Sequence, residues 1–154
     1  MNRVVLAMLA ALALAAHEAP AQSKPNFSGS WKMNAARSDF GPVPAPASIA
    51  RKITHAEPSL AIVEDQDAGS GVQTVTRVYT TDGRGSSFMS QGAEVKGTAV
   101  WEGNDLVVTS EVEVVPLKYI DRMSLSDDGK TMTSAIKLAS PDGAIDVKVI
   151  FEKQ

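Results

Sequence analysis

The chain has 154 residues, a net charge of −3 at pH 7 and no cysteine. Its length fits one domain of ordinary size behind a short leader, and the lack of cysteine excludes disulfides, thiol nucleophiles and a lipid attached through cysteine. The negative charge comes without a basic block, which argues against nucleic acid or an anionic membrane as a partner.

Residues 1–21 have the pattern of a secretory signal peptide. Arg3 supplies the positive end, residues 4–16 are apolar, and residues 19–21 read Ala-Pro-Ala, which places small residues where a signal peptidase cleaves. The apolar run is shorter than the roughly 20 residues of a membrane-spanning helix. We therefore expect an exported protein, periplasmic or secreted, whose residues 22–154 form a single domain with no membrane insertion.

The first predicted strand covers residues 27–34, and a proline-rich segment follows at residues 41–47. Proline fixes φ and lacks a backbone N–H donor, so this segment can neither hold a helix nor pair as a strand. We expect it to run as an extended connector across one end of the domain.

From Ser48 onward the apolar residues tend to alternate, and turn signals recur about every 8–12 residues, the pattern of a β-sandwich or barrel. Glycine, proline, asparagine and aspartate mark these turns because each suits a particular turn geometry. The predicted turns lie at residues 57–58, 68–71, 82–85, 91–92, 103–104, 128–129 and 141–143.

The register of the hairpins can be tested, because directly opposed residues share one face of a sheet. Closing residues 102–105 as a loop pairs Trp101 with Leu106 and Val95 with Val112, and the glutamates of both strands fall on the other face. The hairpin therefore has one apolar and one solvated face.

Two later hairpins support each other. Closing residues 127–130 and closing residues 141–144 as loops both place Ser134, Ile136 and Leu138 on one face. This agreement predicts an all-β fold, an up-and-down antiparallel meander closed into a barrel of about eight to ten strands with no free edge.

The same reasoning extends towards the N-terminus. A tight turn at residues 92–93 sets Phe88 opposite Gly97, where a large ring would cover exposed backbone. The preceding turn then sets Tyr79 opposite Phe88, so that Arg77 and Tyr79 share the apolar face.

Residues 27–33, with the sequence FSGSWKM, resemble the opening motif of the calycins, the group of the lipocalins and fatty-acid-binding proteins. In that group the tryptophan plugs one end of an up-and-down barrel and the glycine allows close backbone approach. Residues 100–108 and 147–153 also look like that group. The chain is similar to small exported bacterial proteins of the lipocalin-like type as well. The resemblance implies a ligand-holding barrel.

The sequence also departs from that group. Fatty-acid-binding proteins carry an Arg-x-Tyr clamp for the ligand carboxylate on their last strand, where this chain has Val149 and Phe151. Their helical lid is replaced by the proline-rich segment. Residues 76–79 spell the clamp as Thr-Arg-Val-Tyr, but on an early strand.

Seven residues form the predicted ligand-binding set. Arg77 and Tyr79 are predicted to anchor an anion, since a guanidinium binds a carboxylate through two parallel donors; the alternative is a surface pair in another register. For Asp121 three explanations are open: pairing with Arg77, orienting a polar ligand, or lying near the rim in water. Four further members either contact a ligand or fill the core: Phe88, Trp101, Tyr119 and Met123.

Catalysis finds little support in the sequence. His17 falls in the leader and leaves His55 as the one other imidazole, and neither cysteine nor a Gly-x-Ser-x-Gly turn is present. One histidine and scattered carboxylates form no metal-ligand cluster. We expect no enzyme, no cofactor and no metal.

The sequence thus predicts a non-enzymatic exported protein that holds a small, largely apolar ligand, fatty-acid-like or another amphiphile, in a barrel cavity. The alternative is an envelope protein-interaction or inhibitor module with a filled barrel. A continuous pocket of at least about 300 Å³ favours the carrier. A solid core with an exposed apolar patch favours a protein partner.

Overall fold

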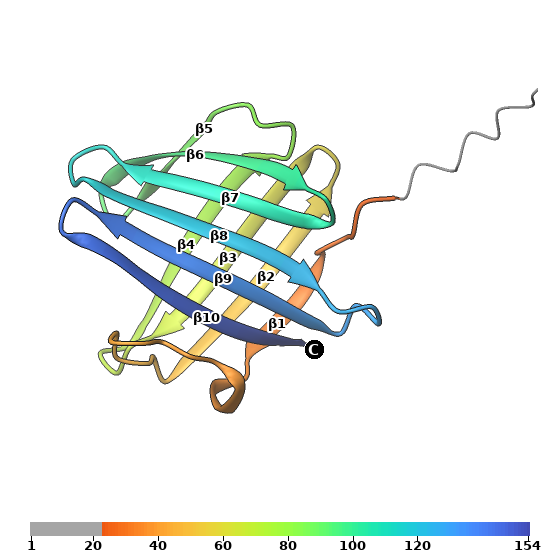
Figure 1. Cartoon of the computed structure of the whole chain (residues 1–154), viewed down its shortest axis with the longest axis horizontal. Helices are drawn as coiled ribbons and strands as arrows, with labels where there is room; N and C mark the ends of the chain where they lie inside the picture. The colour runs from red at the N-terminus through yellow and green to blue at the C-terminus, as the bar shows by residue number, and fades with distance from the viewer. Residues whose placement is uncertain (1–22) are drawn as a thin grey trace, which may run out of the picture.

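A computed structural model describes residues 23–154, which form a ten-stranded antiparallel barrel (Figure 1). The predicted signal peptide, residues 1–21, lies outside the described residues. Within residues 23–154, no helix is long and apolar enough to cross a membrane. The elements are β1 (Gly29–Met33), the 3-10 turn η1 (Ala35–Arg37), β2 (Ser48–Ala56), β3 (Ser59–Asp67), β4 (Val72–Thr80), β5 (Ser86–Ser90), β6 (Ala93–Glu102), β7 (Asp105–Val112), β8 (Leu117–Leu125), β9 (Thr131–Ser140) and β10 (Gly143–Lys153).

The strands follow one another around the barrel in the order β4-β3-β2-β1-β10-β9-β8-β7-β6-β5. In Figure 1, strands β7 to β10 cross in front of β2 to β4. The fold class predicted from the sequence is confirmed, with one difference. Strands β4 and β5 are not paired with each other, so the barrel is nearly closed instead of free of edges.

The predicted registers of β6–β7 and β8–β9 are confirmed along their whole length. The β9–β10 hairpin differs by two residues, because its turn consists of residues 141–142 alone, and Ile136 therefore faces Val147 in place of Val149. A shift of two leaves every side chain on its predicted face, since side chains alternate with a period of two.

Gly97 of β6 is covered by Tyr79 and not, as predicted, by Phe88. Phe88 lies opposite Val95, and its ring packs edge-on against Tyr79 with 5.6 Å between the ring centres. A Cβ atom on Gly97 would lie 2.6 Å from Cε1 of Tyr79 and 2.9 Å from the carbonyl oxygen of Thr109. The site therefore has no room for a side chain.

We expect Gly97→Ala to lower the free energy of unfolding by about 1–3 kcal/mol, because the added carbon must displace a buried ring or a carbonyl of the sheet. Urea unfolding followed by circular dichroism measures the change. Gly85→Ala is the matched control, since no atom lies within 4 Å of the Cβ it would add. Equal effects of the two substitutions would contradict this packing argument.

Trp31 fills the core at the end of the barrel where the described chain begins. Its side chain is 1% exposed, and its Nε1 donates a hydrogen bond of 2.9 Å to the carbonyl of Phe27. Gly29 has a φ of +140°, a conformation that glycine adopts without a steric penalty. The structure thus confirms the buried, structural position that the sequence motif predicts for Trp31.

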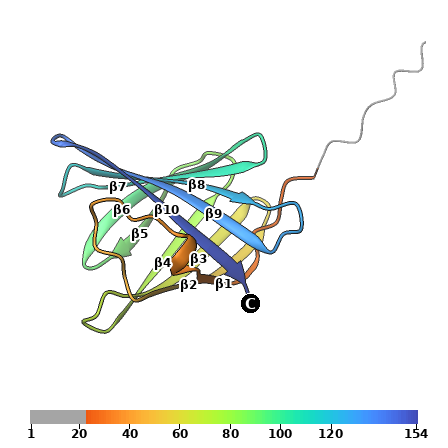
Figure 2. The same cartoon turned by 60° about the horizontal axis from the view of Figure 1, so that its bottom comes forward.

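The segment between β1 and β2 lies across the opposite end of the barrel, as Figure 2 shows when that end is brought forward. Asp39 exchanges two backbone hydrogen bonds of 2.7 Å with Lys148 of β10, and the amide of Ala47 donates one of 2.8 Å to the carbonyl of Asp67. The proline-rich segment predicted at residues 41–47 is therefore fastened at both ends and occupies the place predicted for it; together with Phe40 it is called the connector, residues 40–47.

Candidate functional site

Strand β2 brings an arginine into the barrel. Its side chains alternate between solvent and interior, and Arg51 falls on the inner face between Ile49 and Ile53, with 2% of its surface exposed. Glu64 of β3 is its direct cross-strand partner, so both side chains point into the barrel.

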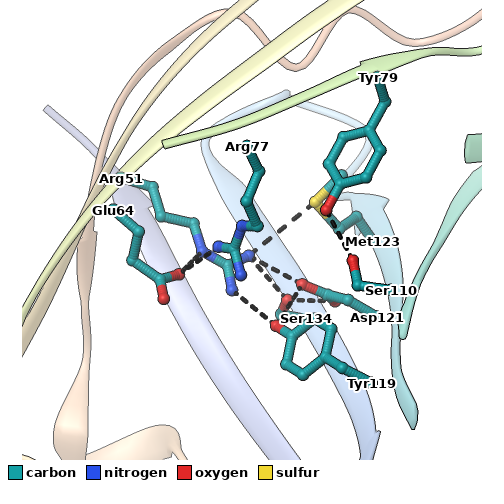
Figure 3. A network of polar contacts seen from close by, with 9 residues as sticks. All are labelled: Arg51, Glu64, Arg77, Tyr79, Ser110, Tyr119, Asp121, Met123 and Ser134. Carbon is teal, nitrogen blue, oxygen red and sulfur yellow. Dashed lines mark hydrogen bonds and ion pairs between the residues drawn. The ribbon is translucent and has the colours of Figure 1, made fainter. Parts of the chain in front are cut away.

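Arg51 is the centre of a network of polar contacts (Figure 3). Its Nε donates to Oε2 of Glu64, and its Nη1 donates to Oδ2 of Asp121 at 3.1 Å and to Oγ of Ser134 at 2.9 Å. Arg77 of β4 donates from Nη2 to the same Oε2 of Glu64 at 2.9 Å. With Tyr119, these residues are the interior polar cluster: Arg51, Glu64, Arg77, Tyr119, Asp121 and Ser134.

Aromatic rings surround the two guanidinium groups. The hydroxyl of Tyr119 accepts a hydrogen bond of 3.4 Å from Arg51 and donates one of 3.2 Å to Asp121. The ring centre of Tyr119 lies 5.6 Å from the guanidinium of Arg77, and that of Phe151 lies 4.6 Å from the guanidinium of Arg51. These contacts hold the buried charges in fixed positions.

The charges of the cluster stabilise one another against the cost of burial. Burial by itself would raise the pKa of Glu64, but the positive charges of Arg51 and Arg77 lower it to about 2. Burial would lower the pKa of Arg51, but Glu64 and Asp121 raise it above its ordinary value. Burial, followed by the carboxylate of Asp121, raises the pKa of the Tyr119 phenol. The two guanidiniums therefore face two carboxylates.

This arrangement predicts an acid-sensitive fold. Because the pKa of Glu64 lies near 2 in the folded protein and near 4.5 ordinarily, its stabilisation is complete above about pH 4.5 and is lost as the pH falls towards 2. At about 1.4 kcal/mol per pKa unit the loss is about 3 kcal/mol.

Urea unfolding of the wild type and Glu64→Gln at several pH values between about 7 and 2 measures this loss. The difference in unfolding free energy between the two proteins should shrink as the pH falls, because Glu64 becomes protonated in the wild type. The other carboxylates titrate in both proteins and therefore cancel from the difference. A difference that stays constant with pH would contradict the assignment to Glu64.

A cavity of about 140 Å³ lies at the connector end of the barrel. This volume is below the about 300 Å³ of typical ligand pockets and near the about 150 Å³ that can hold benzene in an engineered protein. The cavity is lined by Arg51, Glu64 and Tyr119 of the cluster, by Gln66, and by apolar side chains: Phe40, Val43, Pro44, Pro46, Ile49, Ile136, Leu138, Val147 and Val149.

The structure brings most of the predicted ligand-binding residues together, although only Tyr119 lines the cavity. Arg77 and Asp121 both point inward (Figure 3). Asp121 is 3% exposed and pairs with Arg51, so the explanations that place it in water or with Arg77 are wrong. Met123 is buried and lies 3.9 Å from Arg51 through its sulfur.

The two residues of the predicted anion anchor, Arg77 and Tyr79, contact different polar partners within the protein. Arg77 binds Glu64, whereas the hydroxyl of Tyr79 forms a hydrogen bond of 2.8 Å with Ser110. Phe88 packs against Tyr79 and is only half-buried. Arg77 and Tyr79 thus both face inward as predicted, but each already has a polar partner within the protein.

Trp101 lies away from the cluster, at the Trp31 end of the barrel. Its Nε1 donates a hydrogen bond of 2.8 Å to Glu57, and its ring centre lies 6.0 Å from that of Phe27 and 5.9 Å from that of His55. The structure does not bring Trp101 to the other predicted ligand-binding residues. Its contacts are those of a residue that packs the barrel end.

Arg51 and Glu64 were missed among the predicted site residues, although the sequence carries a signal for both. Inward side chains alternate along β2 as Ile49, Arg51 and Ile53, and along β3 Ile62 precedes Glu64 by two. A charged residue two positions from a buried isoleucine on the same strand is expected to point into the interior as well.

The comparisons with known proteins bear on the fold. No protein-family model matches the sequence, and a search of curated proteins found no match. A secretory abundant heat soluble protein from Ramazzottius varieornatus is 11% identical, with a TM-score of 0.64 over 83% of this chain and 95% of its own. A zebrafish ileal bile-acid-binding protein complexed with cholic acid is 15% identical, with a TM-score of 0.62 over 83% of this chain and 98% of its own.

A third similar structure, the REP1-NXSQ fatty acid transporter, is 13% identical, with a TM-score of 0.59 over 83% of this chain and 96% of its own. At these identities the likeness shows the fold alone, a nearly closed barrel of ten antiparallel strands similar to those of the fatty-acid-binding proteins, as predicted from the sequence.

Proposed function

We propose that this protein is a non-enzymatic carrier that holds a small amphiphile in its barrel. The observation that carries the proposal is the cavity at the connector end, in which apolar walls meet the polar side chains of Arg51, Glu64 and Tyr119. An amphiphile fits such a lining, since its apolar part gains from burial at about 25 cal/mol per Å² and a few polar groups orient its head.

The calycin fold supports this proposal. The similar structures include a bile-acid-binding protein and a fatty acid transporter. The location proposed for the carrier is outside the cytoplasm, which the signal pattern of residues 1–21 supports.

The cavity of about 140 Å³ accepts the head of an amphiphile together with only a short length of chain. A longer chain has to extend past Phe40, Val43, Pro44 and Pro46, which line the cavity from the connector. We therefore propose that the middle of the connector, between its attachments at Asp39 and Ala47, moves outward when a long ligand binds.

Fluorescence titration with N-phenyl-1-naphthylamine, an uncharged amphiphilic probe, tests the proposal. We expect a saturable signal with one probe per chain, and we expect Leu138→Trp, which fills the cavity, to weaken binding about tenfold or more. Lys137→Trp, on the outer face of the same strand, is the control and should leave binding unchanged. No saturable signal, or equal effects of the two substitutions, would contradict a ligand site in the barrel.

Two observations favour a second candidate function, a protein-interaction module. The interior is largely filled, and the β7–β8 turn, which was not among the predicted turns, exposes Val114 and Val115 at 77% and 51%. Exposed apolar side chains of this kind occur at protein contacts. Failure of the probe titration would favour this candidate over the carrier.

A further inference from the structure

The two arginines inside the barrel are already neutralised by the protein itself. Oε2 of Glu64 accepts from Arg51 and from Arg77, and Asp121 accepts from Arg51 at 3.1 Å. Figure 3 shows the carboxylate of Glu64 directed at both guanidiniums. A position between two arginines, which could receive the carboxylate of a ligand, is thus occupied by a side chain of the chain itself.

Within residues 23–154 each guanidinium of this cluster is already paired with a carboxylate, although the buried Nε of Arg77 has no hydrogen-bond partner. A second carboxylate would add a negative charge next to Glu64, in surroundings where the side chain of Arg51 is 1% exposed and that of Glu64 is 12% exposed, and buried like charges repel strongly. Protonation does not vacate the position either, since the pKa of Glu64 near 2 keeps its carboxylate charged at neutral pH.

Glu64 nevertheless has one oxygen left for a ligand. Both of its ion pairs use Oε2, and among residues 23–154 no side chain or amide donates a hydrogen bond to Oε1. Glu64 also lines the cavity of about 140 Å³. The group that complements a buried carboxylate oxygen is a hydrogen-bond donor, such as a hydroxyl or an N–H.

We propose that Glu64 binds the head of the ligand through Oε1, and that the barrel takes an uncharged amphiphile with a hydroxyl or N–H donor in preference to a fatty acid. This inference rests on the proposed carrier function and names the class of its ligand. Glu64 thereby selects against carboxylates by occupying the position between Arg51 and Arg77.

Calorimetric titration with 1-decanol and with decanoate at neutral pH tests the inference, because the two ligands share one chain length and differ in the charge of the head. We expect the wild type to bind decanol about tenfold or more tightly than decanoate. We expect Glu64→Gln, which leaves the cluster with one positive charge in excess, to bind decanoate about tenfold or more tightly than the wild type does.

The double substitution Glu64→Gln/Arg77→Gln is the matched control. It removes one charge of each sign, so Arg51 keeps Asp121 as its partner and the cluster is neutral again. We expect the gain in decanoate affinity to disappear in this protein. Persistence of the gain would show that it does not come from the charge of the cluster, which would overturn the inference.

Two further outcomes separate this inference from the proposed function. Decanoate binding at least as tightly as decanol to the wild type would overturn the preference and leave the carrier function standing. Absence of binding by both ligands would overturn the carrier function and the inference with it. Circular dichroism establishes that each variant is folded, and the wild-type preference decides the question if Glu64→Gln does not fold.

Discussion

Arg51→Met is expected to lower the free energy of unfolding by about 3–5 kcal/mol, because it leaves the carboxylates of Asp121 and Glu64 buried without their shared cation. Arg51 bonds both carboxylates as well as Ser134 and Tyr119. Methionine fills a similar volume, so the loss reports on charge and hydrogen bonding more than on packing.

Urea unfolding at neutral pH measures this change, with Lys52→Met as the matched control. Lys52 is the next residue of β2 and points to solvent, so its replacement should change the unfolding free energy by no more than about 0.5 kcal/mol. If Arg51→Met is as mild as Lys52→Met, then the cluster is not the charge network that the structure describes.

Trp31→Ala is expected to cost about 3–5 kcal/mol, the usual range for removing a large buried aromatic side chain. The substitution opens a cavity where the side chain is 1% exposed and deprives the carbonyl of Phe27 of the hydrogen bond from Nε1. Both effects act next to the polar cluster, since Trp31 lies directly opposite Arg51 in the β1–β2 register.

Trp31→Phe serves as its comparison, because it keeps most of the buried ring and loses the N–H donor. We expect it to cost clearly less than Trp31→Ala, about 1–2 kcal/mol. Thermal unfolding of the three proteins, followed by circular dichroism, gives the ranking.

Most of the fold could be predicted because it depends on local patterns. Alternation and turn residues identify the strands, and the β6–β7 and β8–β9 registers follow from the residues next to each turn. The predicted loop length was wrong at residues 141–142, but the register error was two residues, so each side chain of β9 and β10 still lies on its predicted face. The β7–β8 turn was missed because Val114 and Val115 continue the apolar pattern of a strand.

The candidate site could be predicted only in part. Tyr119, Asp121 and Met123 were placed on the inner face from their hairpin registers, and the structure places them there. The predicted register of Trp101 is also correct, yet this residue lies at the other end of the barrel. A hairpin register fixes the face on which a residue lies, but not its position along the barrel axis relative to distant strands.

The amino-acid sequence by itself determined the all-β class, the faces of the strands and the buried tryptophan, since these depend on side-chain period, turn chemistry and contacts between neighbouring strands. The tertiary structure alone decided the pairing of charges. Arg51 and Asp121 lie 70 residues apart along the chain, and they meet because β2 and β8 face each other across the barrel. Whether an interior charge is free or neutralised depends on such distant partners, because Coulomb interactions act through space and not along the chain.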